Sequence, residues 1–76
     1  MRITEQQKAV LQVLADMGLS SAALVAPNVL KILHGKGNGV LMEGVHNYLA
    51  KQININNFYF AKYEQGGNGV TIVEFK

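Results

Sequence analysis

A glycine-rich segment and two histidines are the residues of this 76-residue chain whose types and spacing could do chemistry. The segment reads Gly-Lys-Gly-Asn-Gly from Gly35 to Gly39, and consecutive backbone amides at a helix start can hold an anion. A P-loop, however, needs a preceding strand and Gly-Lys-Ser/Thr after four intervening residues. The dinucleotide fingerprint Gly-x-Gly-x-x-Gly is also absent. We therefore interpret the segment as a connector between two elements.

The two histidines, His34 and His46, lack the companions that a catalytic or metal site needs. The chain has no Cys, and Glu43 is the one nearby acid, whereas zinc takes three or four protein ligands. Glu43 and His46 could share a hydrogen bond on a helix, but nothing supplies a nucleophile or a third, orienting group. The sequence therefore predicts surface histidines on helices, with no metal and no cofactor.

The acidic residues are too widely spread to act in pairs. Two carboxylates close together would be needed for acid–base work on a glycoside or a phosphate. Their spacing predicts a protein that is not an enzyme. These residues are Glu5, Asp16, Glu43, Glu64 and Glu74.

Length and composition predict one small domain. A chain of this size buries roughly 60% of its unfolded surface, so its stability is marginal. The 49% hydrophobic share argues against disorder and leaves a homodimer open, while a net charge of +2 is low for a nucleic-acid binder. The absence of Cys fits the cytoplasm. Met1 leads into a polar helix start without a signal peptide, and no apolar run approaches the ~18 residues of a membrane span.

The first fifty residues have the pattern of three to four helices. Thr4 and Gln7 have capping-box spacing, and an apolar stripe runs from Val10 to Met17. Pro27 suits the first turn of a new helix and disfavours the α conformation in the residue before it. A single kinked helix across Pro27 is the alternative. The predicted helices cover about 4–17, 21–26, 27–34 and 39–51.

One repeated tetrapeptide leaves the last of these helices open. Gly37 begins a Gly-Asn-Gly-Val sequence that recurs at Gly67. The second copy reads as a turn entering a strand, so residues 39–43 could be a strand as well. We retain the helix because the 3.6-residue period continues to Lys51.

The C-terminal twenty residues predict a β-hairpin with strands at about 57–64 and 70–75. β-branched and aromatic residues flank a glycine-rich turn at 66–69. The register stays open, since a one-residue slip exchanges the two faces. Either register leaves aromatic rings on both faces, so we expect helices on one face and a partner on the other. The rings predicted at a protein interface are Phe58, Tyr59, Phe60 and Tyr63.

The order helix, short helix, turn, helix, hairpin resembles the winged helix-turn-helix superfamily. Residues 4–17, Leu19–Leu24 and 58–75 carry this resemblance, with residues 66–69 as the wing. It implies an α+β fold in which three to four N-terminal helices pack on a C-terminal antiparallel β-hairpin, and a small regulatory protein that binds DNA. The predicted DNA contacts are Lys36, Asn38, His46, Asn47, Lys51, Lys62 and Asn68.

Two other non-enzymatic roles remain open. A protein-binding inhibitor or adaptor, of the type found in phages and mobile elements, would dock on a larger host complex through the hairpin. A structural homo-oligomer would instead use the apolar surface. Clustered lysines would favour nucleic acid, and an exposed aromatic patch would favour protein.

Overall fold

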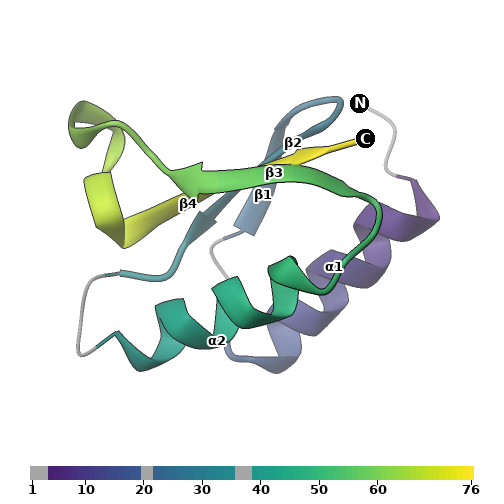
Figure 1. The fold of residues 1–76 in the computed structure, drawn as a ribbon, viewed down its shortest axis with the longest axis horizontal. Helices are drawn as coiled ribbons and strands as arrows, with labels where there is room; N and C mark the ends of the chain where they lie inside the picture. The colour runs from purple at the N-terminus through teal and green to yellow at the C-terminus, as the bar shows by residue number, and fades with distance from the viewer. Residues whose placement is uncertain (1–3, 20–21, 36–38) are drawn as a thin grey trace.

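The computed structural model describes residues 4–19, 22–35 and 39–76, which form two layers (Figure 1). A four-stranded antiparallel sheet makes one layer, and two helices lie against one of its faces. The strands are ordered β1-β2-β4-β3, so β2 and β4 are central. The elements are α1 (Glu5–Asp16), β1 (Ala22–Ala26), β2 (Val29–Leu33), α2 (Val40–Ala50), β3 (Ile55–Phe60) and β4 (Val70–Phe75), with 3₁₀ turns at Tyr63–Gln65 and Gly67–Gly69.

The helices predicted at 21–26 and 27–34 are wrong, because these residues form the β1–β2 hairpin. Pro27 starts its two-residue turn, and the fixed φ of proline suits the first central position of a turn as well as it suits a helix start. Pairing of β2 with β4 then decides that residues 29–33 form a strand and not a helix. A short apolar segment can adopt either conformation, and hydrogen bonds to a neighbouring strand select the extended one. The predicted set of three to four helices on a hairpin is therefore wrong: the described residues form two helices and four strands.

Helix α1 begins with the predicted capping box. The Thr4 hydroxyl accepts from the backbone N–H of Gln7 at 3.1 Å, and the Gln7 side-chain oxygen accepts from the backbone of Thr4 at 3.1 Å. The Gln7 amide also donates to the carbonyl oxygen of Pro27 at 2.9 Å. One buried side chain thus joins the start of α1 to the turn between β1 and β2.

Replacing Gln7 with alanine is expected to lower the free energy of unfolding by about 1–3 kcal/mol, because Gln7 is 4% exposed and both of its hydrogen bonds would be lost. The neighbouring Gln6 is exposed, and Gln6→Ala should stay within about 0.5 kcal/mol of the parent. Urea unfolding followed by circular dichroism measures both variants. Equal midpoints for the two would contradict the linking role of Gln7.

The C-terminal hairpin has a defined register, and its first strand ends earlier than predicted. Strand β3 stops at Phe60, because Tyr63–Gln65 coils into a 3₁₀ turn in place of the strand expected to residue 64. Phe58 lies opposite Val73, and Tyr59 lies opposite Ile72. Residues 40–43, left open between helix and strand, are helical.

The core lies between the helices and one face of the sheet. Leu30 and Val73 are fully buried at the centre of that face, where they pack with side chains from both helices. The opposite face carries Val25 and Leu33, which are 56% and 52% exposed, and neither helix covers it. Neither described helix is long and apolar enough to cross a membrane. The buried core residues are Val10, Leu14, Leu19, Leu30, Ile32, Val45, Leu49, Ile55, Val73 and Phe75.

Candidate functional site

The two histidines meet at a single buried hydroxyl group. Nε2 of His34 lies 2.7 Å from Oγ1 of Thr71, and Nε2 of His46 lies 2.8 Å from the same oxygen. Nδ1 of His34 makes a further 2.8 Å hydrogen bond to the carbonyl oxygen of Gly35. Thr71 is 0% exposed, whereas both rings are partly exposed. We call these three residues the His–Thr–His cluster.

The sheet places two members of the cluster together. Ile32 in β2 pairs with Thr71 in β4, and alternation along the strand brings His34, two residues later, to the same face. The backbone N–H groups of His34 and Gly35 both donate to the carbonyl oxygen of Gly69, at 3.2 and 2.9 Å. His34 is thereby held at the end of the β2–β4 ladder, on the side that the helices cover.

Helix α2 and strand β3 position the third member. His46 follows the fully buried Val45 on α2, so its ring lies at the edge of the helix–sheet interface. Its ring centroid lies 5.2 Å from that of Phe58 and 5.1 Å from that of Phe60. The His34 ring is edge-on at 6.1 Å. His46 is therefore held against two aromatic rings and one other imidazole.

These surroundings lower the pKa of His46 below its usual 6.5. Burial, which penalises the charged ring, is the larger cause, and repulsion by a charge on His34 is the smaller. A lowered pKa keeps the imidazole neutral at pH 7, which is the form that can accept a proton. The cluster is thus suited to acid–base chemistry. Because Thr71 is fully buried, its hydroxyl cannot meet a substrate as a nucleophile in this arrangement.

Acidification is expected to destabilise the folded chain through His46. The unfolded chain binds a proton at this residue near pH 6.5, while the folded chain resists it until a lower pH. The unfolding free energy should therefore fall as the pH drops below 6.5, and level off below the folded pKa. Denaturant titrations across this range measure the slope. His46→Gln should give a shallower dependence, and an identical profile would show that His46 does not cause it.

The prediction that both histidines are surface residues of helices is wrong for His34, which follows a strand, and incomplete for His46, which is half-buried. The cluster was missed because its members are distant in the chain: Thr71 lies 37 residues from His34 and 25 from His46. A usable signal was the run Val29–Leu33 between Pro27-Asn28 and Gly35, whose length between two turn signals fits a buried strand.

The structure spreads the other predicted DNA contacts over separate elements. Asn47 is exposed on α2, and Lys62 and Asn68 are exposed in the connection between β3 and β4. Lys51 caps the C-terminal end of α2. Because α2 has 11 residues and a helix rises 1.5 Å per residue, Lys51 lies about 16 Å from the start of this helix. Lys36 and Asn38 lie outside the described residues.

The four aromatic residues predicted at a protein interface lie in different environments. Phe58 packs against the core, and Phe60, on the same face, contacts His46. Tyr59 lies on the open face of the sheet, where its hydroxyl donates to Glu74 at 2.8 Å. Tyr63 is 90% exposed in the turn after β3. They therefore do not form one continuous patch.

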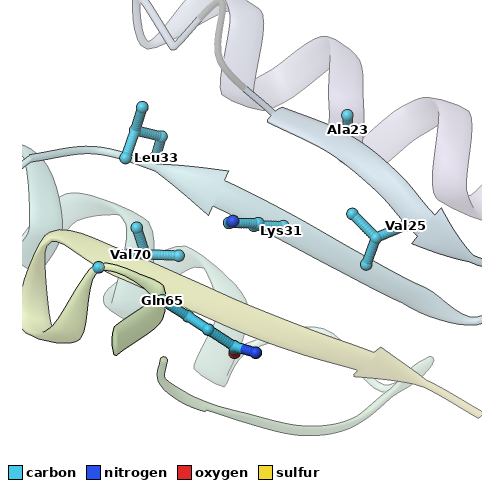
Figure 2. Close-up of a pocket in the computed structure, with 7 residues that line it drawn as sticks. Ala23, Val25, Lys31, Leu33, Gln65 and Val70 are labelled. Atoms are coloured by element: carbon cyan, nitrogen blue, oxygen red, sulfur yellow. The ribbon is translucent and has the colours of Figure 1, made fainter. Parts of the chain in front are cut away.

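A separate hollow of about 300 Å³ lies on the open face of the sheet (Figure 2). Aliphatic side chains line it, including Val25 from β1, Leu33 from β2 and Val70 from β4. Lys31 is its one titratable residue, so the hollow has no partner for acid–base chemistry. Within the described part of the chain, no group of three or more His, Cys, Asp or Glu residues is placed to hold a metal ion. The His–Thr–His cluster is therefore the candidate site.

Comparison with known proteins places the chain in a family. The sequence-family model that describes the Smr domain matches residues 1–76 of this chain. Endonuclease MutS2 of Ligilactobacillus salivarius is 44% identical over 61 residues, which cover 80% of this chain and 8% of that protein. Endonuclease MutS2 of Geobacillus sp. is 43% identical over 58 residues, covering 76% of this chain and 7% of that protein. The chain thus spans less than a tenth of the curated relatives it matches.

A solved structure agrees with this assignment. The crystal structure of the Smr domain of Thermus thermophilus MutS2 superposes with a TM-score of 0.65 at 29% identity, covering 95% of this chain and 79% of that one. These findings overturn the winged-helix resemblance, the transcription-regulator role derived from it and the separately predicted phage-type adaptor. They also overturn the prediction of a non-enzymatic protein, because the relatives are endonucleases. This chain belongs to the Smr domain family.

Proposed function

We propose that this Smr domain is an endonuclease domain that cuts one strand of DNA, and that it works in the cytoplasm. The observation that carries the proposal is the convergence of two imidazoles on the buried Thr71 hydroxyl in a chain whose relatives are endonucleases. Hydrolysis of a phosphodiester needs a base for the attacking water and an acid for the leaving oxygen. Histidine can serve as both near neutral pH.

The reaction would use the cluster as one acid–base unit. Water attacks phosphorus, its proton passes to the imidazole pair, and the bond from phosphorus to the leaving sugar oxygen breaks. The same proton then returns from the pair to that oxygen. A neutral His46, favoured by its lowered pKa, supports the first half of this cycle at pH 7.

Substrate binding would draw on one end of the molecule. Helix α2 starts at the same end of the sheet as the β3–β4 connection (Figure 1), and the positive end of a helix dipole attracts phosphate. Lys62 and Asn68 in that connection would add phosphate contacts, together with Lys36 and Asn38. Asn47 and Lys51, further along α2, would contact a longer stretch of the duplex. Phosphate contacts of this kind make binding salt-dependent.

Conversion of a supercoiled plasmid into open circles tests the proposal. A covalently closed circle has no ends, so an exonuclease cannot start on it, and a single cut relaxes it. The purified chain would be incubated with the plasmid in Mg²⁺, in Mn²⁺ and in a chelator as parallel arms. Open circles that increase with enzyme and time are expected. Intact supercoils in all arms at low salt would refute the nuclease function.

A further inference from the structure

The hydrogen bonds of His34 determine which of its two ring nitrogens carries the proton. A carbonyl oxygen only accepts, so Nδ1 of His34 must donate in its 2.8 Å bond to Gly35. A neutral imidazole has a single N–H, so Nε2 of neutral His34 is an acceptor. Thr71 therefore donates its hydroxyl proton to His34 across 2.7 Å.

The same hydroxyl accepts from the second histidine. Thr71 has one proton, already directed at His34, and two lone pairs. The 2.8 Å contact with Nε2 of His46 is then a hydrogen bond only if His46 donates. Nδ1 of neutral His46 is consequently an acceptor, and none of the residues in the described ranges donates to it. This nitrogen is the open end of a hydrogen-bonded chain.

We propose that Thr71 joins the two histidines into one proton relay that is entered at Nδ1 of His46 and ends at Nε2 of His34. A proton arriving at Nδ1 of His46 lets the Nε2 proton pass to Thr71, whose own hydroxyl proton passes to His34. His34 then carries a proton on each nitrogen, Thr71 again carries one, and His46 is neutral with its proton on Nδ1. One proton is gained overall. The hydroxyl now points towards His46, so the return transfer uses the same bonds reversed.

The surroundings favour a single stored proton. The two rings are 6.1 Å apart and partly shielded from water, so two positive charges would repel each other. Strands β3 and β4 present Phe58, Phe60 and Thr71 to His46, and none of these titrates near neutral pH. On α2, Glu43 is exposed one turn before His46 and forms no hydrogen bond with either ring.

A role of the relay in DNA cleavage rests on the proposed function. The hydrogen-bonded relay itself does not depend on that function. In the nuclease, the proton of the attacking water would enter at His46 and be held on His34. Thr71 is then a positioning residue, because it is fully buried yet holds the Nε2 proton of His46, while the Gly35 carbonyl holds the Nδ1 proton of His34. Thr71→Val keeps the shape and removes the hydroxyl, while Thr71→Ser keeps the hydroxyl, so the pair of variants isolates that one group.

Nuclear magnetic resonance of ¹⁵N-histidine-labelled chain tests the relay directly. In the parent at high pH, His34 should carry its proton on Nδ1 and His46 should carry its proton on Nε2. Thr71→Val should abolish the Nε2 preference of His46 while His34 keeps its proton on Nδ1, and Thr71→Ser should restore the parent pattern. The opposite tautomers in the parent, or an unchanged His46 tautomer in Thr71→Val, would overturn the relay. The parent spectrum decides this even if Thr71→Val does not fold.

Plasmid cleavage by the same variants separates the relay from the nuclease function. The relay predicts that Thr71→Val cuts about tenfold more slowly or worse, with Thr71→Ser close to the parent. Cleavage at the parent rate in Thr71→Val would overturn the use of the relay in catalysis. If the parent itself does not cut, the proposed function fails, and the tautomer pattern still decides whether the relay exists.

Discussion

Replacing His34 with alanine is expected to slow plasmid nicking by about 100- to 10,000-fold, the range that one acid–base group typically contributes. The variant loses the ring that receives the Thr71 hydroxyl proton and is anchored to the Gly35 carbonyl. His46 would remain beside Thr71 but without the group to which its proton passes. Adding His46→Ala to this variant should therefore slow cleavage little further, because residues that act as one unit are not additive.

Measuring the effect of His34→Ala requires a control variant that changes neither the fold nor the His–Thr–His cluster. Gln12→Ala serves, since Gln12 is exposed on α1 and bonds only to Asp16 at 3.1 Å. Circular dichroism would confirm that all variants keep the parent's fold. If His34→Ala cuts as fast as Gln12→Ala, or if the losses of the two histidine variants simply multiply, the cluster does not act as one unit.

Replacing Leu30 with alanine is expected to cost about 2–5 kcal/mol of unfolding free energy. Leu30 is 0% exposed in β2, between Leu24 in β1 and Val73 in β4. The helices and three strands close around it, so the cavity cannot collapse easily. A domain of this length has only roughly 4–11 kcal/mol in total, and a large share of the molecules would unfold. Urea unfolding would show a lower midpoint with a similar slope.

The same strand supplies a matched control on its other face. Leu33 is 52% exposed, so Leu33→Ala removes the same atoms and should change stability by no more than about 0.5 kcal/mol. The contrast also tests which face of the sheet the helices cover. Equal losses in the two variants would mean that the open face is covered in solution.

Patterns among neighbouring residues predicted both helices and the C-terminal hairpin. The capping box at Thr4 and the apolar stripe to Met17 indicated α1, and the period from Val40 to Lys51 indicated α2. Glycine and β-branched residues indicated the hairpin of β3 and β4, although β3 ends at Phe60. Each of these patterns depends on residues a few positions apart.

The β1–β2 hairpin could not be predicted in this way. Alanine-rich residues 22–26 and Pro27 fit a helix and its start as well as they fit a strand and a turn. Pairing of β2 with β4, some forty residues later in the chain, decides between them. Because this pairing joins residues far apart in the chain, the residues around positions 22–33 contain no signal for it.

The sequence by itself determined the absence of thiol chemistry, the presence of only two imidazoles and, among its predicted helices, the positions of α1 and α2. Only the tertiary structure decided that these imidazoles lie together, because the end of β2, helix α2 and strand β4 each bring one residue to the same buried point. The physical reason is distance along the chain. His34, His46 and Thr71 share no sequence period, and they meet only when the sheet register places Thr71 beside Ile32 and the helix packs His46 beneath it.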